Sequence, residues 1–345
     1  MKQHPDCNPV LVEIFRGNTL ESFHRGVICA VDEKGKVIFS KGDIHQVCYP
    51  RSAMKFLQTI PLIESGAADF FGLTEEEIAI TLGSHNGEEE HVIVVDSILK
   101  KAGLNRTHLQ CGPQMPTLRK DSTRLIREGK SAEAIHNNCS GKHAGFLALS
   151  VFLKAPVDGY LKPNHPVQQQ IQNLVSEMYE YPLQKMECGL DGCSAPIYSV
   201  PVYHQALGFK NLSCGEHFST HRAIACKRIL QAARNYPFMI AGSNRYCTDL
   251  IATCGQKIIG KTGAEGIFCM VLPEHKIGVC IKIDDGKMLP QYNVAQAFVE
   301  ASGLFDEASL RPLSKYKQDS LKNWNKLTTG KIKPIDNIFD DLKLN

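Results

Sequence analysis

Short apolar segments separated by turn residues run through the first part of the chain. Residues 11–15, 26–31 and 37–40 are rich in Val, Ile and Phe and have the length of β-strands. The polar run at residues 32–35 supplies the residues of a tight turn between the last two segments. This pattern therefore predicts one strand followed by a β-hairpin.

The same pattern returns near the other end of the chain. Residues 266–272 and 276–283 predict a second hairpin across a turn at residues 273–275. Residues 291–302 predict a helix, and the polar sequence from Leu313 onward predicts a peripheral tail or a closing helix. Strands are thus expected at both ends of the chain.

Apolar residues in the middle of the chain follow the period of amphipathic helices instead. Thr74 and Glu77 have the spacing of a capping box at a helix start. Residues 88–102 predict a helix that ends before a glycine, which favours helix termination. Further helices are predicted over residues 142–155 and from Pro166 onward.

Together these elements predict an α+β fold. An antiparallel sheet formed from both chain ends is flanked by helices, and a mainly helical lobe is inserted between the ends. We assign residues 1–60 and 185–345 to the sheet-containing α/β lobe, and residues 61–184 to the helical lobe. The candidate active site is expected in the cleft between the two lobes.

The composition narrows the class of protein. With 345 residues, of which 43% are hydrophobic and 22% charged, the chain can bury a large core and has the balance of an ordinary globular protein. The net charge of +3 is spread along the sequence, and no basic stretch alternates with aromatic residues. A nucleic-acid partner is therefore not expected. No apolar run has the roughly 18 residues of a membrane span, so no membrane partner is expected either.

The thirteen cysteines are an odd number, and the first residues contain no apolar signal core. Reduced thiols in a cytoplasmic protein fit this pattern better than a disulfide framework. Most of these cysteines are expected to be buried as small apolar side chains.

The first chemical signal is Ser52-Ala53-Met54-Lys55, a Ser-x-x-Lys motif that enters an apolar helical stretch. Positions i and i+3 lie on one helix face, so Lys55 can reach the Ser52 hydroxyl. An uncharged lysine amine can take the proton of a serine and make it a nucleophile. Lys261-Thr262-Gly263, between two predicted strands, supplies a second amine, and the two motifs together indicate acyl transfer.

Ser84 lies in a Gly-rich polar segment, residues 83–87, just before an acidic helix start. One interpretation is structural: Ser84 or Asn86 caps that helix. The other is functional: the Ser84 hydroxyl relays a proton between Lys55 and the leaving group of a substrate. The sequence alone leaves both open.

Two further segments combine cysteines with small residues. Cys139 precedes Lys142 by three residues at a predicted helix start, and Cys193 lies in a Gly-rich loop. Two thiolates, a nitrogen donor and water would make a tetrahedral zinc site. His143 is another candidate ligand, or else a polar wall of the substrate site. The spacing matches no common zinc motif, so a metal does not follow from these residues alone.

At these residues the sequence resembles the class 3, rhizobial-type L-asparaginases, the asparaginase II family. The resemblance extends over roughly residues 10–301. The segments that carry it are Tyr49-Pro50-Arg51-Ser52-Ala53-Met54-Lys55, Gly83-Ser84-His85, Asn138-Cys139-Ser140-Gly141-Lys142-His143, Cys188-Gly189-Leu190-Asp191-Gly192-Cys193 and Gly263-Ala264-Glu265-Gly266. It implies a fold like that of the serine β-lactamases and class A glutaminases.

The resemblance also implies hydrolysis of L-asparagine by a homodimer. By matching position, Ser52 is the expected nucleophile, and Lys55, Ser84 and Lys261 complete the proton network. The same matching makes zinc the expected cofactor and gives its ligands as the following residues: Cys139, Lys142 and Cys193.

The substrate's α-amino and α-carboxylate groups would be held by Arg51, His143 or Asp191. Alternatives on the same scaffold are a glutaminase, a β-lactam or peptide hydrolase, and a non-catalytic ligand-binding relative. A relative without catalysis would not need all four groups of the proton network, which favours an enzyme.

Overall fold

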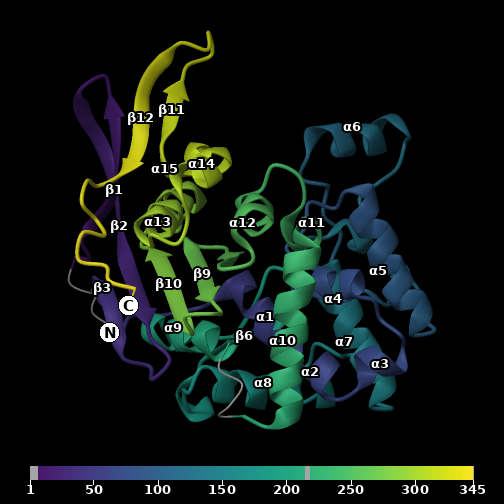
Figure 1. Ribbon diagram of the computed structural model, residues 1–345. Helices are drawn as coiled ribbons and strands as arrows, with labels where there is room; N and C mark the ends of the chain where they lie inside the picture. The colour runs from purple at the N-terminus through teal and green to yellow at the C-terminus, as the bar shows by residue number, and fades with distance from the viewer. Residues whose placement is uncertain (1–6, 214–217, 345) are drawn as a thin grey trace. The chain divides into compact units, whose positions relative to one another are not determined.

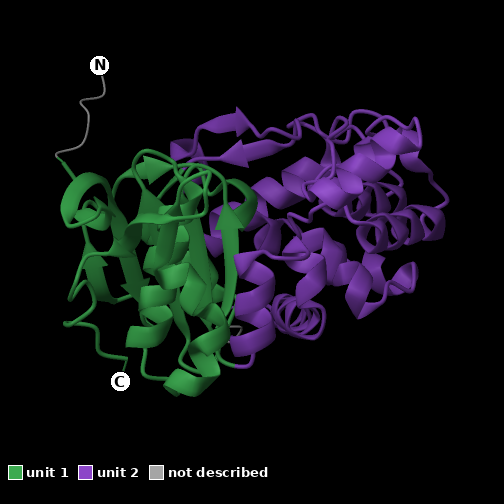
Figure 2. Ribbon diagram, turned by 90° about the horizontal axis from the view of Figure 1, so that it is seen from above, with its two compact units in different colours: residues 1–53, 200–213, 257–345 green, residues 54–199, 214–256 purple. Residues whose placement is uncertain are grey.

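The computed structural model describes residues 7–213 and 218–344. The chain divides into two compact units, which Figure 2 colours green and purple. Unit 1 comprises Met1–Ala53, Val200–Ser213 and Lys257–Asn345, and unit 2 comprises Met54–Ser199 and Cys214–Gln256.

Unit 1 is built on an antiparallel sheet whose strands come from both ends of the chain (Figure 1). Its strands are β1 (Val10–Arg16), β2 (Thr19–Val31), β3 (Val37–Lys41), β8 (Ile259–Gly263), β9 (Ile267–Leu272), β10 (Ile277–Ile283), β11 (Asp319–Lys322) and β12 (Thr328–Pro334). Their order is β11-β12-β1-β2-β10-β9-β8, and β3 pairs with β2 off this path. The predicted α+β class, both hairpins and the origin of the sheet in both chain ends are confirmed.

Helices cover both faces of this sheet. The other elements of unit 1 are β4 (Val47–Cys48), β7 (Val200–Pro201), α9 (Val202–Asn211), α13 (Met288–Ala301), α14 (Glu307–Leu310), η6 (Arg311–Leu313) and α15 (Ser314–Lys317). A Cβ on Gly278 of β10 would lie 2.0 Å from the carbonyl oxygen of Ala206 in α9. Phe268 of β9 instead contacts Tyr292 of α13. Phe268 pairs with Ile281, and Ile281 lies three residues after Gly278, so Phe268 and Gly278 face opposite sides of the sheet. The helices that they contact, α13 and α9, therefore lie on opposite faces.

The segment after Leu313 is not the peripheral tail or closing helix that the sequence predicts. Residues 319–334 of this segment form the β11–β12 hairpin, and β12 pairs with β1, as the yellow and purple arrows of Figure 1 show. Along β12, Ile332 and Pro334 are buried, whereas the lysine that precedes each of them, Lys331 or Lys333, is not. This alternation is typical of a strand with one buried face, and the many polar residues conceal it.

Unit 2 is mainly helical. Its elements are α1 (Lys55–Gln58), α2 (Ile60–Glu64), α3 (Ala67–Phe70), α4 (Glu75–Leu82), α5 (Glu89–Lys101), η2 (Arg106–His108), α6 (Arg119–Arg127), η3 (Ala134–His136), α7 (Ser140–Phe152), α8 (Pro166–Met178), η4 (Leu183–Lys185), β5 (Cys188–Leu190), β6 (Pro196–Tyr198), α10 (Thr220–Asn235), α11 (Pro237–Ala241) and α12 (Tyr246–Cys254). The short turn η1 (Arg51–Met54) joins the two units along the chain.

Helix α4 is the central element of unit 2 and packs against α5, α7, α10 and α11. It begins at the predicted capping box, in which Thr74 and Glu77 each accept the other's backbone N–H. A Cβ on Gly141 of α7 would lie 2.4 Å from the carbonyl oxygen of Ile80, so a glycine is needed where α7 crosses α4. This packing fixes the end of α4 and the start of α7 close together.

The bounds of the two units differ from those of the predicted lobes. The sequence assigns residues 54–60, 185–199 and 218–256 to the sheet lobe, whereas they cluster with the helical unit. In the last of these segments α10 buries Ala225 and Ile229 and packs against α2 and α4. Within the described residues, no helix is both long enough and apolar enough to cross a membrane.

Candidate active site and metal centre

The Ser-x-x-Lys motif lies where the chain passes from unit 1 to unit 2. The half-buried Ser52 belongs to η1, and α1 begins at Lys55, one helical turn later. Arg51, directly before the serine, has a φ of 52°. A left-handed conformation is strained for arginine, and strained residues of this kind cluster at functional sites.

The second motif occupies the edge strand β8 of unit 1. Lys261 stands opposite Cys269 and Thr262 opposite Phe268, so their side chains lie on opposite faces of the sheet. The Lys261 side chain is fully buried, and its Nζ donates to the carbonyl oxygen of Thr262 at 2.9 Å. The Thr262 hydroxyl donates to Tyr292 at 3.1 Å. The two polar residues of the motif therefore have different surroundings.

The end of β8 and the segment before Ser52 approach each other within unit 1. A Cβ on Gly263 would lie 2.4 Å from the carbonyl oxygen of Pro50, so only a glycine allows this contact. After Gly263 the chain reaches Glu265, whose carboxylate lies 3.7 Å from the guanidinium of Arg51. Lys282 of β10, only 8% exposed, donates to the carbonyl oxygen of Glu265 at 2.7 Å. These contacts hold the backbone beside Ser52 in place.

In unit 2, Lys55 is fully buried and directed at three oxygen atoms. Its Nζ lies 2.6 Å from the carbonyl oxygen of Gly83, 3.0 Å from Oγ of Ser84 and 3.3 Å from the carbonyl oxygen of Asn138. Nζ donates to all three oxygens, including that of the Ser84 hydroxyl. Nζ of Lys55 and Oγ of Ser84 are thus in direct hydrogen-bond contact, so a proton can pass between these two side chains.

Ser84 follows the end of α4 and does not cap α5. The N-cap position of α5 is Glu88, and Nδ1 of His91 accepts the N–H of Glu88. The backbone N–H of Ser84 donates to the carbonyl oxygen of Ile240 at 2.8 Å. The helix-capping interpretation of Ser84 and Asn86 is therefore wrong, and the Ser84 side chain is held against Lys55 instead.

Three groups that can bind a metal gather at the start of α7. The ligand atoms of Cys139, Asp191 and Cys193 all lie within 4.8 Å of one another. Lys142 donates from Nζ to Sγ of Cys193 at 3.2 Å. The predicted ligands Cys139, Lys142 and Cys193 are thus brought together, although they come from separate segments of the chain. Two sulfurs with a nitrogen or a carboxylate oxygen are a donor set that suits zinc.

The charges in this cluster are arranged around one thiolate. A hydrogen bond from Cys139 holds the pKa of Cys193 far below that of a free thiol, against the effect of burial, and the Lys142 ammonium adds to this. Sharing that hydrogen with Cys193 raises the pKa of Cys139. Burial disfavours the charged form of Lys142, but the two sulfurs outweigh it and raise the pKa of Lys142. In this structure the Lys142 ammonium neutralises the negative charge of the Cys193 thiolate.

The three residues expected to bind substrate lie in different places. Arg51 is in unit 1, whereas His143 and Asp191 are in unit 2 next to the thiols. Nδ1 of His143 lies 2.7 Å from the Tyr160 hydroxyl, and burial lowers the pKa of His143. Asp191 has its carboxylate 3.9 Å from Sγ of Cys193. The sequence assigns Asp191 to substrate alone, and the structure adds that it is a possible metal ligand.

Two parts of the site escape the sequence reasoning. The carbonyl oxygens of Gly83 and Asn138 that receive Lys55 have no residue signature, because any residue supplies a carbonyl. Lys282, in contrast, leaves a signal: it is the single charge in the apolar strand Ile277–Ile283. A lysine in such a strand costs free energy unless its ammonium is hydrogen-bonded, so it indicates a built contact.

The sequence matches the family model described as L-asparaginase II over residues 12–334, which is most of the chain. No curated protein sequence matches it significantly.

Several solved structures are similar to parts of the chain. A putative β-lactamase from Bacteroides dorei has 12% identity and a TM-score of 0.42, and the match covers 75% of this chain and 84% of that one. A β-lactamase from Mycobacterium bovis has 14% identity and a TM-score of 0.38, with 80% and 94% covered. Simvastatin synthase from Aspergillus terreus has 11% identity and a TM-score of 0.40, with 79% and 91% covered.

Proposed function

The chain belongs to the L-asparaginase II family, and from this premise we propose that it hydrolyses L-asparagine to L-aspartate and ammonia. Family membership makes the chain a hydrolase of the asparaginase type. The observation that carries the finer proposal is the buried Lys55. Its Nζ lies 3.0 Å from the Ser84 hydroxyl, and the residue follows Ser52 by one helical turn.

In the proposed route, Oγ of Ser52 attacks the side-chain amide carbon and its proton passes to uncharged Lys55. Backbone N–H groups stabilise the oxyanion, and one lost donor of this kind typically costs about 2.7–4 kcal/mol. The C–N bond then breaks, and Ser84 passes a proton to the departing ammonia. Water cleaves the resulting ester and releases L-aspartate. Lys261 completes the proton network.

Cys139, Lys142 and Cys193 would hold zinc, with Asp191 beside them. Bound there, zinc would supply positive charge that attracts the α-carboxylate group of the substrate. His143 and Arg51 would contribute to the same binding. The two sulfurs and the Lys142 nitrogen are buried and adjacent, which supports this ligand set; Lys142 would bind zinc after its ammonium releases a proton.

Ammonia release by the purified protein tests the substrate directly. We expect release from L-asparagine to exceed release from L-glutamine, and no turnover of the β-lactam nitrocefin. Faster release from glutamine would favour a glutaminase, and nitrocefin turnover would favour a β-lactam hydrolase. No turnover of any of the three would support a non-catalytic relative.

The nucleophile is tested by intact-mass spectrometry with substrate or a slow analogue. We expect an acyl adduct on the wild-type chain, none on Ser52→Ala, and one on Ser84→Ala that persists longer because proton transfer is impaired. Full activity of Ser52→Ala, with no adduct on the wild-type chain, contradicts this route.

The zinc site is tested by metal analysis of single variants. Cys139→Ser and Cys193→Ser should each lose stoichiometric zinc, because each replaces one of the two thiolate ligands with a hydroxyl, a much weaker zinc donor. Cys111→Ser is a matched control: Cys111 is also buried and lies near Cys193, and burial raises its pKa to about 12. Zinc retained by both ligand variants would assign the metal to other residues.

A further inference from the structure

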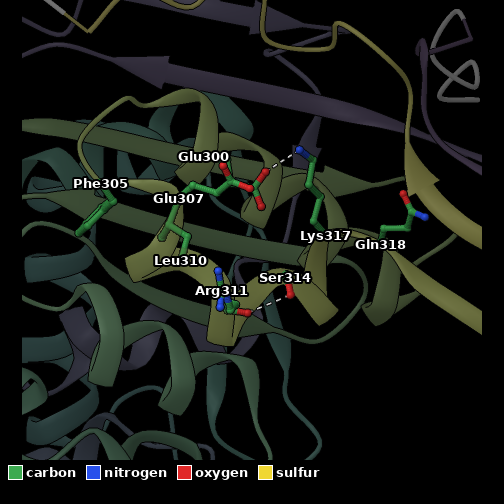
Figure 3. Close-up of a pocket in the computed structure, with 8 residues that line it drawn as sticks. All are labelled: Glu300, Phe305, Glu307, Leu310, Arg311, Ser314, Lys317 and Gln318. Atoms are coloured by element: carbon green, nitrogen blue, oxygen red, sulfur yellow. Dashed lines mark hydrogen bonds and ion pairs between the residues drawn. The ribbon is translucent and has the colours of Figure 1, made fainter.

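A pocket of about 610 Å³ lies in unit 1, between the end of α13 and the short helices that follow it. The residues that line it all come from positions 300–318, and Figure 3 shows them from one side. Small-molecule sites in proteins typically have roughly 300–1,000 Å³, so the pocket has room for a small ligand. None of the residues in the proposed reaction lines it.

Two of the charged side chains in this pocket neutralise each other. Lys317 is paired with the carboxylate of Glu300, as the dashed line in Figure 3 marks. Gln296 also donates to Glu300 at 3.3 Å, and Asn293 donates to the carbonyl oxygen of Lys317 at 3.1 Å. These contacts hold Lys317 and Glu300 in place, and the two residues form one wall of the pocket.

The two remaining charges, Glu307 and Arg311, form no ion pair with any residue that the structure describes. They lie four positions apart across α14 and η6, a separation at which oppositely charged side chains often pair. Both are exposed to solvent within the pocket. The pocket thus offers one unpaired anion and one unpaired cation to a ligand.

An apolar surface accompanies these charges. Leu310 is 6% exposed, and Phe305 is half-buried. The Phe305 ring contacts Lys257, whose Nζ lies 5.4 Å from the ring centroid and donates to the carbonyl oxygen of Leu304 at 2.8 Å. In Figure 3, Phe305 and Leu310 stand on the same side of the pocket as Glu307.

We propose that this pocket binds a free α-amino acid with an apolar side chain. Its carboxylate meets Arg311, its ammonium meets Glu307, and its side chain covers Phe305 and Leu310. A simple anion would leave Glu307 unpaired, and a simple cation would leave Arg311 unpaired. A residue inside a peptide carries neither charge. The polar side chain of asparagine does not match the apolar surface, so the pocket is distinct in specificity from the proposed catalytic site.

Isothermal titration with L-leucine and L-phenylalanine tests this proposal on the full chain. We expect saturable binding that is at least roughly tenfold weaker in Arg311→Gln and in Glu307→Gln, since each loses a charge-assisted contact. N-acetyl-leucine lacks the ammonium and leucinamide lacks the carboxylate, so each should bind the wild-type chain more weakly than leucine by a similar factor. Arg228→Gln is the control, because Arg228 is a half-buried arginine of unit 2 paired with Asp69, and this variant should bind normally.

Further outcomes separate this site from the proposed asparaginase activity. Ser52→Ala should bind leucine like the wild type, and Arg311→Gln should release ammonia from asparagine at the wild-type rate when no leucine is present. The proposal is overturned if leucine and phenylalanine show no binding at about 10 mM. It is equally overturned if both pocket variants bind them normally, or if asparagine displaces leucine.

Discussion

Gly263 illustrates how a residue without a side chain determines the position of reactive ones. It ends β8 two residues after Lys261, and its missing side chain lets the carbonyl oxygen of Pro50 approach. Arg51 is strained and Ser52 follows it directly. The position of the expected nucleophile thus depends on backbone packing as well as on the reactive groups.

Gly263→Ala should therefore lower kcat for ammonia release more than it lowers stability. The new Cβ would lie 2.4 Å from a backbone oxygen, so the segment before Ser52 must shift. Misplacing a catalytic group by about 1 Å typically costs up to roughly 100-fold in rate. Steady-state kinetics together with thermal unfolding measure both effects. Gly17→Ala is the control for kcat: nothing lies within 4 Å of the Cβ it would add, so its cost comes from the φ of +55° alone and should lower stability while leaving kcat unchanged. An unchanged kcat in Gly263→Ala would show that this approach does not position the serine.

Reactive residue types could be predicted from the sequence, but their surroundings could not. The sequence predicts that Cys139 and Cys193 act together, and the structure places their sulfurs close to each other. The carbonyl acceptors of Lys55 depend on where α4 ends and α7 begins, which is tertiary information. The sequence predicts only a substrate-binding role for Asp191, because no spacing rule links it to the cysteines. The roles of these residues in catalysis stay predictions.

At the scale of elements, strands with strong apolar runs and helices with clear caps could be predicted, and a polar strand could not. The predicted hairpin of residues 276–283 with 266–272 is confirmed by the register of β9 and β10. β12 differs because its buried residues alternate with lysines, and its partner β1 lies more than 300 residues earlier in the chain. Pairing over this separation leaves no local signal.

Ile332→Ala should destabilise the protein by about 2–4 kcal/mol, the usual cost of truncating a buried aliphatic side chain. Ile332 is 2% exposed and stands opposite Ile14 of β1. Leu327→Ala, in the same hairpin, is the control, because Leu327 is 63% exposed and its loss should change stability by less than about 0.5 kcal/mol. Urea denaturation measures both. Equal small effects would mean that the C-terminal hairpin contributes nothing to the core.

For the whole molecule, the distribution of buried histidines decides how stability depends on pH. His85 and His91 are fully buried in unit 2, and their rings stack with centroids 4.9 Å apart. Burial lowers the pKa of both, and for His85 the positive charge of the Arg245 guanidinium adds to the effect. Nε2 of His85 lies 3.0 Å from Oγ of Ser140, and Nδ1 accepts the N–H of Gly87. The folded state therefore holds His85 as an uncharged imidazole.

We accordingly expect the free energy of unfolding of metal-free protein to fall as the pH is lowered from about 7 to about 5. Both histidines have a lower pKa folded than unfolded, so the unfolded chain binds more protons below the ordinary histidine pKa of about 6.5. The stability that each uncharged histidine contributes is fully present above the pKa of the unfolded state. It is lost as the pH falls from there to the lower pKa of the folded state, by up to about 1.4 kcal/mol per pH unit for each histidine. Urea denaturation in the presence of a chelator, at several pH values, measures the slope. His85→Gln should reduce it, whereas His221→Gln, an exposed position in the same unit, should not. If the wild-type protein is equally stable at pH 5 and pH 7, buried neutral histidines do not govern its response to acid.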